Sequence, residues 1–125
     1  MPKHIKNLLT HKLTILAILI TISIATVSLI KLGKAPVKIN HLDKFEHAFA
    51  YFILTTIWLR ALKTTKISNY FIVFCCFFYG IIIEVLQTTV TTHRSGEFWD
   101  VVANSMGILI AFIIYNSFFK KNKAI

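Results

Sequence analysis

The chain has 125 residues, of which 56% are hydrophobic, with a formal net charge of +9 and a mean hydropathy of +0.69. A soluble globular domain is usually about 45–50% apolar, so this composition excludes an ordinary soluble domain and favours one integral membrane domain, residues 1–125. The excess of Lys and Arg predicts contact with anionic membrane lipids. It does not indicate a nucleic-acid partner, because the sequence offers no soluble basic scaffold.

The first uncharged apolar run, residues 13–30, follows a short basic stretch, residues 1–12. At about 1.5 Å per residue of helix, this run is about 27 Å long, which is enough to cross a bilayer. A signal peptide has the same order of segments, but its apolar core is usually about 7–15 residues long and precedes a small-residue cleavage site. We therefore expect a retained first membrane span.

The second predicted span, residues 45–62, follows a predicted loop at residues 31–42. Asp43 and Glu46 have the spacing of a helix-capping pair, which predicts that this helix opens at Asp43. Two further apolar runs predict a third span at residues 70–90 and a fourth at residues 98–119. The sequence thus predicts an all-α, four-helix transmembrane bundle.

An even number of spans places both termini on one side of the membrane. The termini and the loop between the second and third spans hold nine basic residues: Lys3, Lys6, Lys12, Arg60, Lys63, Lys66, Lys120, Lys121 and Lys123. The other two loops and their flanks hold five: Lys31, Lys34, Lys38, Lys44 and Arg94. Because basic residues concentrate on the cytoplasmic side, we predict a multi-pass protein of the plasma membrane with both termini in the cytoplasm.

Polar side chains recur in the outward half of the last three predicted spans. They are His47, Glu84, Gln87, Asp100 and Asn104, and three further candidates, Asp43, Lys44 and Arg94, lie just outside the spans. Within each span these residues lie three or four positions apart, so they share one helix face. Glu84 lies about 9 Å inside the end of its span, where lipid cannot satisfy a carboxylate. We therefore expect these side chains to meet in one outward-opening recess.

Small residues on the fourth span support the same arrangement. Ala103, Gly107 and Ala111 form a small-x-x-x-small stripe beside the face that carries Asn104. Such stripes allow close approach of helices in a membrane, where hydrocarbon provides no hydrophobic drive for association. The stripe predicts that the polar face of this span is turned toward other helices.

Several of these residues follow one another in an order that resembles the VanZ-like membrane protein family. The motifs are DKFEHAFAY at 43–51, Glu84-x-x-Gln87, Arg94, Asp100, Asn104 and Gly107. The resemblance covers residues 43 to about 111, although residues 88–93 read TTVTTH where family members often have Gly or Pro and an aromatic residue. It implies a place in the bacterial cell envelope. The name-giving member is associated with reduced susceptibility to the glycopeptide antibiotic teicoplanin, so the resemblance implies antibiotic resistance without naming a reaction.

Three functions are compatible with the sequence. The leading hypothesis is a binding protein whose recess holds an amphiphilic cell-envelope ligand, such as a lipid-linked glycan precursor or a lipoglycopeptide, with Arg94 at its head group. The alternative is a membrane enzyme acting on a lipid head group or a lipid-linked phosphate, with His47, Glu84 and Asp100 as catalytic candidates. The third is a holin-like or assembly subunit, for which the polar residues would be dispensable.

Structural roles and a metal role also stay open for the candidates. Asp43 could be a helix cap, Arg94 a lipid anchor, and Glu84 an acid tied to His47 or Asn104. An oxygen-rich set of one imidazole, two carboxylates and an amide could bind Mg, Mn or Ca. Because no tight ligand motif accompanies that set, the sequence assigns no metal and no cofactor.

Overall fold

The computed structural model describes residues 3–30, 40–90 and 98–118, with side chains described for residues 8–29, 45–86 and 98–118. These residues form four helices: α1 (Lys3–Ile30), α2 (Asn40–Ala61), α3 (Asn69–Val90) and α4 (Phe98–Phe118). No strand occurs in the described ranges, which confirms the all-α, four-helix prediction.

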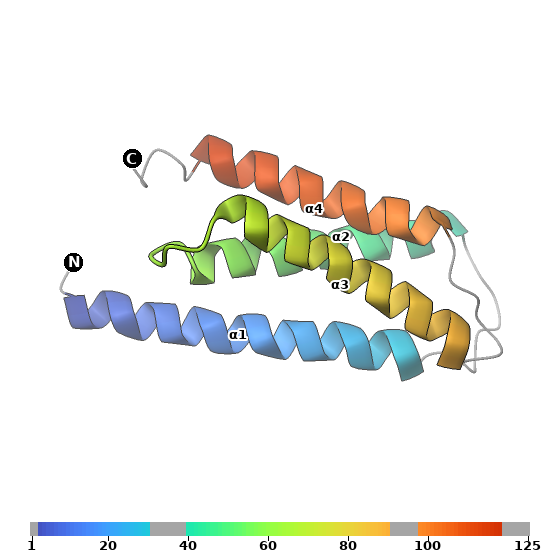
Figure 1. Cartoon of the computed structure of the whole chain (residues 1–125), viewed down its shortest axis with the longest axis horizontal. Coiled ribbons are helices and arrows are strands. Elements are labelled where there is room, and N and C mark those ends of the chain that lie inside the picture. The colour runs from blue at the N-terminus through green and yellow to red at the C-terminus, as the bar shows by residue number, and fades with distance from the viewer. Residues whose placement is uncertain (1–2, 31–39, 91–97, 119–125) are drawn as a thin grey trace.

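The four helices run alternately up and down along one long axis (Figure 1). The start of α1, the turn between α2 and α3 and the end of α4 lie at one end of the bundle. The opposite end holds the start of α2, the end of α3 and the start of α4. The helix α2 contacts all three other helices and packs most extensively against α4.

Three of the helices are long and apolar enough to cross a membrane, within α1 at Leu8–Leu29, within α3 at Asn69–Leu86 and in α4 at Phe98–Phe118. Large apolar side chains such as Phe74 and Ile113 point outward from them, as a lipid-facing surface requires. The helix α2 is less apolar, and its contacts with all three other helices leave less of it to face lipid. At about 1.5 Å per residue, α2 is still about 33 Å long.

Two helix starts differ from the sequence-based expectation. The helix α2 begins at Asn40, so the prediction that it opens at Asp43 is wrong, and part of the predicted loop 31–42 is helical. An acidic residue in the first turn is favourable beside the free backbone N–H groups without being the cap itself. The helix α1 begins at Lys3, before the predicted apolar run 13–30. An apolar run marks only the part of a helix that crosses the membrane, and the helix can continue into the polar segment beside it.

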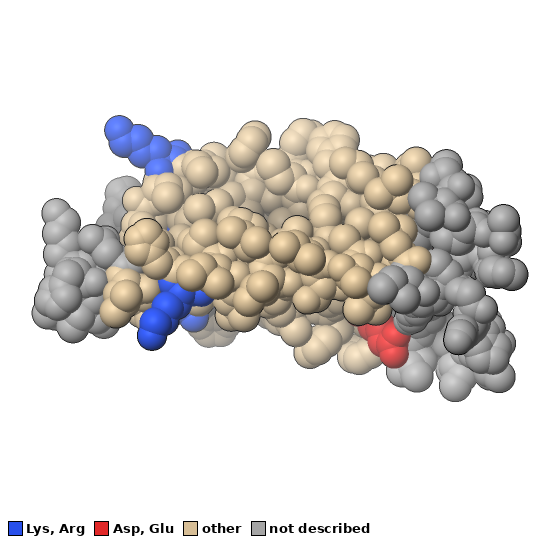
Figure 2. Space-filling model, turned by 90° about the horizontal axis from the view of Figure 1, so that it is seen from below, with Lys and Arg blue, Asp and Glu red and all other residues tan. Residues whose placement is uncertain are grey.

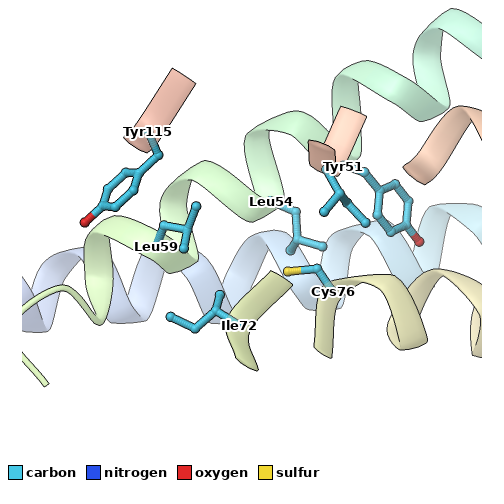
Figure 3. Packing of buried hydrophobic residues seen from close by; sticks show 7 residues of the cluster. Tyr51, Leu54, Leu59, Ile72, Cys76 and Tyr115 are labelled. Atoms are coloured by element: carbon cyan, nitrogen blue, oxygen red, sulfur yellow. The ribbon is translucent and has the colours of Figure 1, made fainter. Parts of the chain in front are cut away.

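The core lies between α2, α3 and α4 (Figure 3). Its buried members are Tyr51, Leu54, Leu59, Ile72, Cys76, Ile108 and Tyr115. The helix α1 joins this core through Thr21, whose hydroxyl accepts a hydrogen bond of 3.0 Å from Trp58 Nε1 and whose carbonyl accepts one from the Tyr79 hydroxyl. Cys75 is exposed and Cys76 buried, both as free thiols.

Of the helix contacts made at Gly80 and Gly107, the closer one lies between α2 and α4. A Cβ atom built on Gly107 would lie only 2.0 Å from the carbonyl oxygen of Ala48, so no larger residue fits there without moving a helix. Gly107 and Ala111 are buried, as the stripe of small residues predicts. This contact positions the N-terminal half of α4 directly against the N-terminal half of α2.

Charged side chains separate along the long axis of the bundle (Figure 2). The described basic side chains, Lys12, Arg60, Lys63 and Lys66, belong to the half that contains the α2–α3 turn. The described acidic side chains, Glu46, Glu84 and Asp100, belong to the opposite half. The bundle therefore has a basic end and an acidic end.

Candidate functional site

Three helices contribute polar side chains to one buried group in the acidic half. We call this group the polar cluster, and it consists of His47 on α2, Glu84 on α3, and Asp100 and Asn104 on α4. The exposed fractions of the last three are 4%, 2% and 3%. The imidazole and the two carboxylates each offer an atom within 4.8 Å of the others. The structure thus brings together four of the residues that helical spacing had indicated.

His47 connects α2 to both members of the polar cluster on α4. Its Nδ1 atom lies 3.1 Å from Asn104 Oδ1, and its Nε2 atom lies 3.9 Å from Asp100 Oδ2. An amide oxygen can only accept a hydrogen bond, so Nδ1 carries the proton in this pair. In the neutral imidazole the lone pair then lies on Nε2, on the side of Asp100. The imidazole is therefore oriented so that Nε2 can take up a proton or a cation.

Local sequence explains how these side chains reach one place. Asp100 and Asn104 are one helical turn apart on α4 and so share a face. The Gly107–Ala48 contact holds that face against α2, one residue from His47. On α3, Gly80 lies one turn before Glu84, and a Cβ atom there would come within 3.3 Å of Asn104 Nδ2. Two glycines therefore let α2 and α3 approach the polar face of α4.

Tyr51 adjoins the polar cluster, although it is not among the site residues that the sequence predicts. It lies one turn after His47 on α2 and is 2% exposed. Its hydroxyl makes no hydrogen bond within the described part of the chain, and it lies close enough to Glu84 to interact electrostatically. The four-residue spacing from His47 is the sequence signal that could have assigned Tyr51 to the site.

The remaining sequence-predicted site residues are not brought into the cluster by anything the structure describes. Asp43 and Lys44 belong to α2 and Gln87 to α3, but their side chains lie outside the described ones. Arg94 lies outside the described residues altogether. Their participation in the site stays a prediction.

A cavity of about 320 Å³ lies between α1, α2 and α3. Its walls are mainly apolar and include Leu54 of α2, Leu62 of the following turn, Phe71 of α3 and Thr21 of α1. No member of the polar cluster lines it. Leu54 is seven residues from His47, so the cavity begins about 10 Å along α2 from the polar cluster. Sequence periodicity gave no sign of this cavity, because it depends on how side chains of three helices fail to fill the space between them.

The polar cluster has a defined chemistry. When ionised, its two carboxylates carry a formal charge of −2 in a region of the bundle flanked by membrane-crossing helices. Charges buried in such surroundings are costly unless they are paired, protonated or bound to a cation. The arrangement can therefore exchange protons, hold a cation, or contact a polar head group through its most exposed member, His47, whose side chain is 13% exposed.

Comparison with known proteins identifies the family. The chain is 32% identical over 102 residues to the uncharacterized protein C11E3.10 of Schizosaccharomyces pombe (strain 972 / ATCC 24843), a match that covers 80% of this chain. The matched part spans 61% of the length of that yeast relative. No solved structure matches the chain. The family model described as VanZ/LLP1 matches residues 4–120, almost the whole sequence, so this chain belongs to the VanZ/LLP1 family of membrane proteins.

Proposed function

We propose that this protein binds an amphiphilic ligand of the cell envelope. In this proposal the polar cluster and the residues around it recognise the head group, and the cavity between α1, α2 and α3 takes an apolar chain. The observation that carries the proposal is the convergence of His47, Glu84, Asp100 and Asn104 from three helices into one buried group. A lipid-linked glycan precursor or a lipoglycopeptide has the required combination of a polar head and a lipid tail.

The energetic cost of the polar cluster supports a functional role. Ionisable residues within membrane-crossing segments are expensive and usually mark a binding or transport site. Glu84 is 4% exposed and Asp100 is 2% exposed, so both are shielded from water by the bundle. A bundle that needed only to be stable would gain from apolar residues of similar volume at these positions. The structural alternative, a holin-like or assembly subunit, offers no reason to keep them.

The separation of charge along the bundle supports the proposed orientation. The basic half would lie at the cytoplasmic face of the plasma membrane together with both termini, because Lys and Arg concentrate there. The polar cluster would then lie near the outer surface, where cell-envelope precursors and glycopeptides are encountered. Teicoplanin-type glycopeptide resistance is the process that this location would serve.

The proposal is tested by measuring ligand binding to the purified protein in lipid nanodiscs. Teicoplanin and a lipid-linked glycan precursor are titrated separately, and the Kd is measured for the wild type, Glu84→Gln and Arg94→Ala. We expect each substitution to weaken binding at least tenfold, whereas Lys66→Ala at the basic end leaves the Kd unchanged. Wild-type binding by both Glu84→Gln and Arg94→Ala, made at normal levels, would contradict the proposal.

A second candidate function is a membrane enzyme acting on a lipid head group or lipid-linked phosphate. The observation that favours it is the orientation of His47, whose Nδ1 is held by Asn104 while Nε2 faces Asp100. An imidazole oriented in this way is suited to general acid–base catalysis. A bell-shaped pH–rate profile that His47→Ala abolishes is expected for such an enzyme. Absence of turnover of lipid phosphates by the purified protein would exclude it.

A further inference from the structure

We propose that the polar cluster is a binding site for one divalent transition-metal ion, with His47 Nε2 and one carboxylate oxygen each from Glu84 and Asp100 as ligands. Asn104 would orient the imidazole through its side-chain oxygen and would not itself be a ligand of the ion. The inference rests on the proposed function for the role of this site, because the ion would lie where the head group is recognised. The occupancy of the site by a metal can nevertheless be measured without any amphiphile.

The distance between His47 Nε2 and Asp100 Oδ2 fits two ligands of one ion, and the Glu84 carboxylate lies close to both. Ligand atoms from His47, Glu84 and Asp100 all lie within 4.8 Å of one another. Bonds from zinc to nitrogen and oxygen ligands are about 2.0–2.2 Å, so two ligands of one ion are up to about 4 Å apart. The 3.9 Å between His47 Nε2 and Asp100 Oδ2 is too long for a direct hydrogen bond but within that range. The two atoms are therefore spaced for an ion between them.

The hydrogen bond at Nδ1 prepares the imidazole to be a ligand. Histidines that bind metals usually donate their other ring N–H to a carbonyl or carboxylate, which fixes the tautomer and the ring orientation. Here Nδ1 lies 3.1 Å from the Asn104 side-chain oxygen, and this leaves the lone pair on Nε2. The donor atom of His47 thus faces the Asp100 carboxylate before any ion arrives.

Charge balance favours a divalent ion over a monovalent one. The carboxylates of Glu84 and Asp100 together have a formal charge of −2 and are both more than nine-tenths buried. A divalent ion matches that formal charge, and pairing with an ion of opposite charge lowers the cost of holding charge inside the membrane.

Tyr51 gives an independent sign that a polar group is needed at this place. Its hydroxyl is buried and forms no hydrogen bond with the described residues, although it lies near enough to Glu84 to interact electrostatically. Figure 3 shows this hydroxyl directed away from the other labelled core residues. A buried hydroxyl usually finds a partner, and an exogenous ligand of the ion, such as water or a phosphate oxygen of a head group, would supply one.

The donor set selects the class of metal. One imidazole with two carboxylates is a mixed set of nitrogen and oxygen ligands. Such a set suits Zn²⁺ and Mn²⁺ better than Mg²⁺ or Ca²⁺, because Mg²⁺ and Ca²⁺ prefer oxygen ligands alone. Three protein ligands leave at least one coordination position open, as in zinc sites that bind a substrate or water. An anionic head group could take that position, which would connect the ion to the proposed ligand.

The test uses the full-length protein purified in detergent, stripped with a chelator and dialysed against Zn²⁺, Mn²⁺ or Mg²⁺ alone. Bound metal per chain is measured by mass spectrometry, and binding by calorimetry. We expect about one Zn²⁺ or Mn²⁺ per chain, and at least tenfold weaker binding in His47→Ala, Glu84→Gln and Asp100→Asn. Glu46→Gln is the matched control, because Glu46 is an exposed acid of α2 beside His47 and should bind metal like the wild type.

Two results would overturn the metal site. One is a wild-type protein that holds no more than a trace of Zn²⁺ or Mn²⁺ under these conditions. The other is a Mn²⁺-loaded wild type whose pulsed electron paramagnetic resonance spectrum lacks the nitrogen coupling of one imidazole. This second measurement needs no variant, so it decides the question even if a substituted protein misfolds. If the metal binds but no amphiphile does, the proposed function fails and the metal site stands. If an amphiphile binds but no metal does, the metal site is wrong and the proposed function is retained.

Discussion

The Nδ1 atom of His47 lies 3.1 Å from the side-chain oxygen of Asn104, across 57 positions of sequence. This hydrogen bond links α2 to α4 at the depth of the two buried carboxylates, and it determines which ring nitrogen faces them. The bond therefore has two consequences, one for the stability of the bundle and one for the chemistry of the cluster.

A double-mutant cycle on His47 and Asn104 should show direct coupling. His47→Phe, Asn104→Leu and the double variant are unfolded in detergent with a chelator present, so that no metal contributes. Hydrogen bonds between membrane helices average about 0.6 kcal/mol and reach about 1.7 kcal/mol in such cycles, and we expect a coupling energy in this range. Strictly additive effects of the two substitutions would show that the bond contributes nothing to stability.

Removal of metal should destabilise the wild type and leave the stability of the Asp100→Asn variant nearly unchanged. A ligand that binds only the folded state stabilises it by about 2.7 kcal/mol at one hundred times its Kd. We therefore expect the unfolding midpoint to rise when Zn²⁺ is added to the stripped wild type, and to fall again with chelator. An equal response of Asp100→Asn would place the bound ion elsewhere.

The contact between Gly107 and Ala48 should make Gly107 the least replaceable glycine of the bundle core. A Cβ atom at Gly107 would meet a backbone oxygen at 2.0 Å, whereas at Gly80 it would meet two side chains at 3.3 Å. Side chains can rotate away, but a helix backbone can move only by separating α2 from α4. Overpacking typically costs about 1–3 kcal/mol, and we expect Gly107→Ala to lose at least this much.

Gly80→Ala is the matched control for that measurement, since both substitutions replace a helical glycine with the best helix former. The free energy of unfolding of the two variants is compared in the same detergent. A loss at Gly80 equal to that at Gly107 would mean that the approach of α2 and α4 is not the limiting contact.

Much of this arrangement could be predicted from the sequence, because burial in a membrane restricts where apolar, polar and small residues can lie along a helix. Apolar runs gave four helices within a few residues of most of their ends, and helical spacing gave the face shared by Asp100 and Asn104. The depth of Glu84 then implied partners on other helices. These predictions succeed because lipid forces polar side chains inward and small residues to the contacts.

Other features could not be predicted, because they depend on tertiary contacts. The spacing of Asp43 and Glu46 suggested a cap, yet α2 starts at Asn40. Which nitrogen of His47 meets Asn104 depends on a side-chain rotamer. The electrostatic interaction of Tyr51 with Glu84 joins neighbouring helices and has no counterpart in the spacing of one helix.

Thr21 should prove to be the main polar attachment of α1. Its hydroxyl accepts a hydrogen bond from Trp58 Nε1 while donating to the Ala17 carbonyl at 2.8 Å. Thr26 makes the same kind of local bond, to the Ile22 carbonyl, but is exposed. Thr21→Val should therefore destabilise the protein by about 0.5–1.5 kcal/mol more than Thr26→Val, as measured by unfolding in detergent. Equal effects would show that the hydrogen bond from Trp58 Nε1 to the Thr21 hydroxyl contributes nothing to the attachment of α1.

The proposed orientation predicts that the start of α2 and the turn after α2 are accessible from opposite sides of the membrane. In a background with Cys75→Ala and Cys76→Ala, single cysteines are introduced as Lys66→Cys and Glu46→Cys, both at exposed positions. Lys66 belongs to the basic half, which should face the cytoplasm because nine Lys and Arg accompany the termini and this turn, against five on the other side. A membrane-impermeant thiol reagent added to intact cells should therefore label Glu46→Cys and leave Lys66→Cys unlabelled until the membrane is opened. The converse pattern would put the polar cluster near the cytoplasmic face, where it could not meet a ligand arriving from outside.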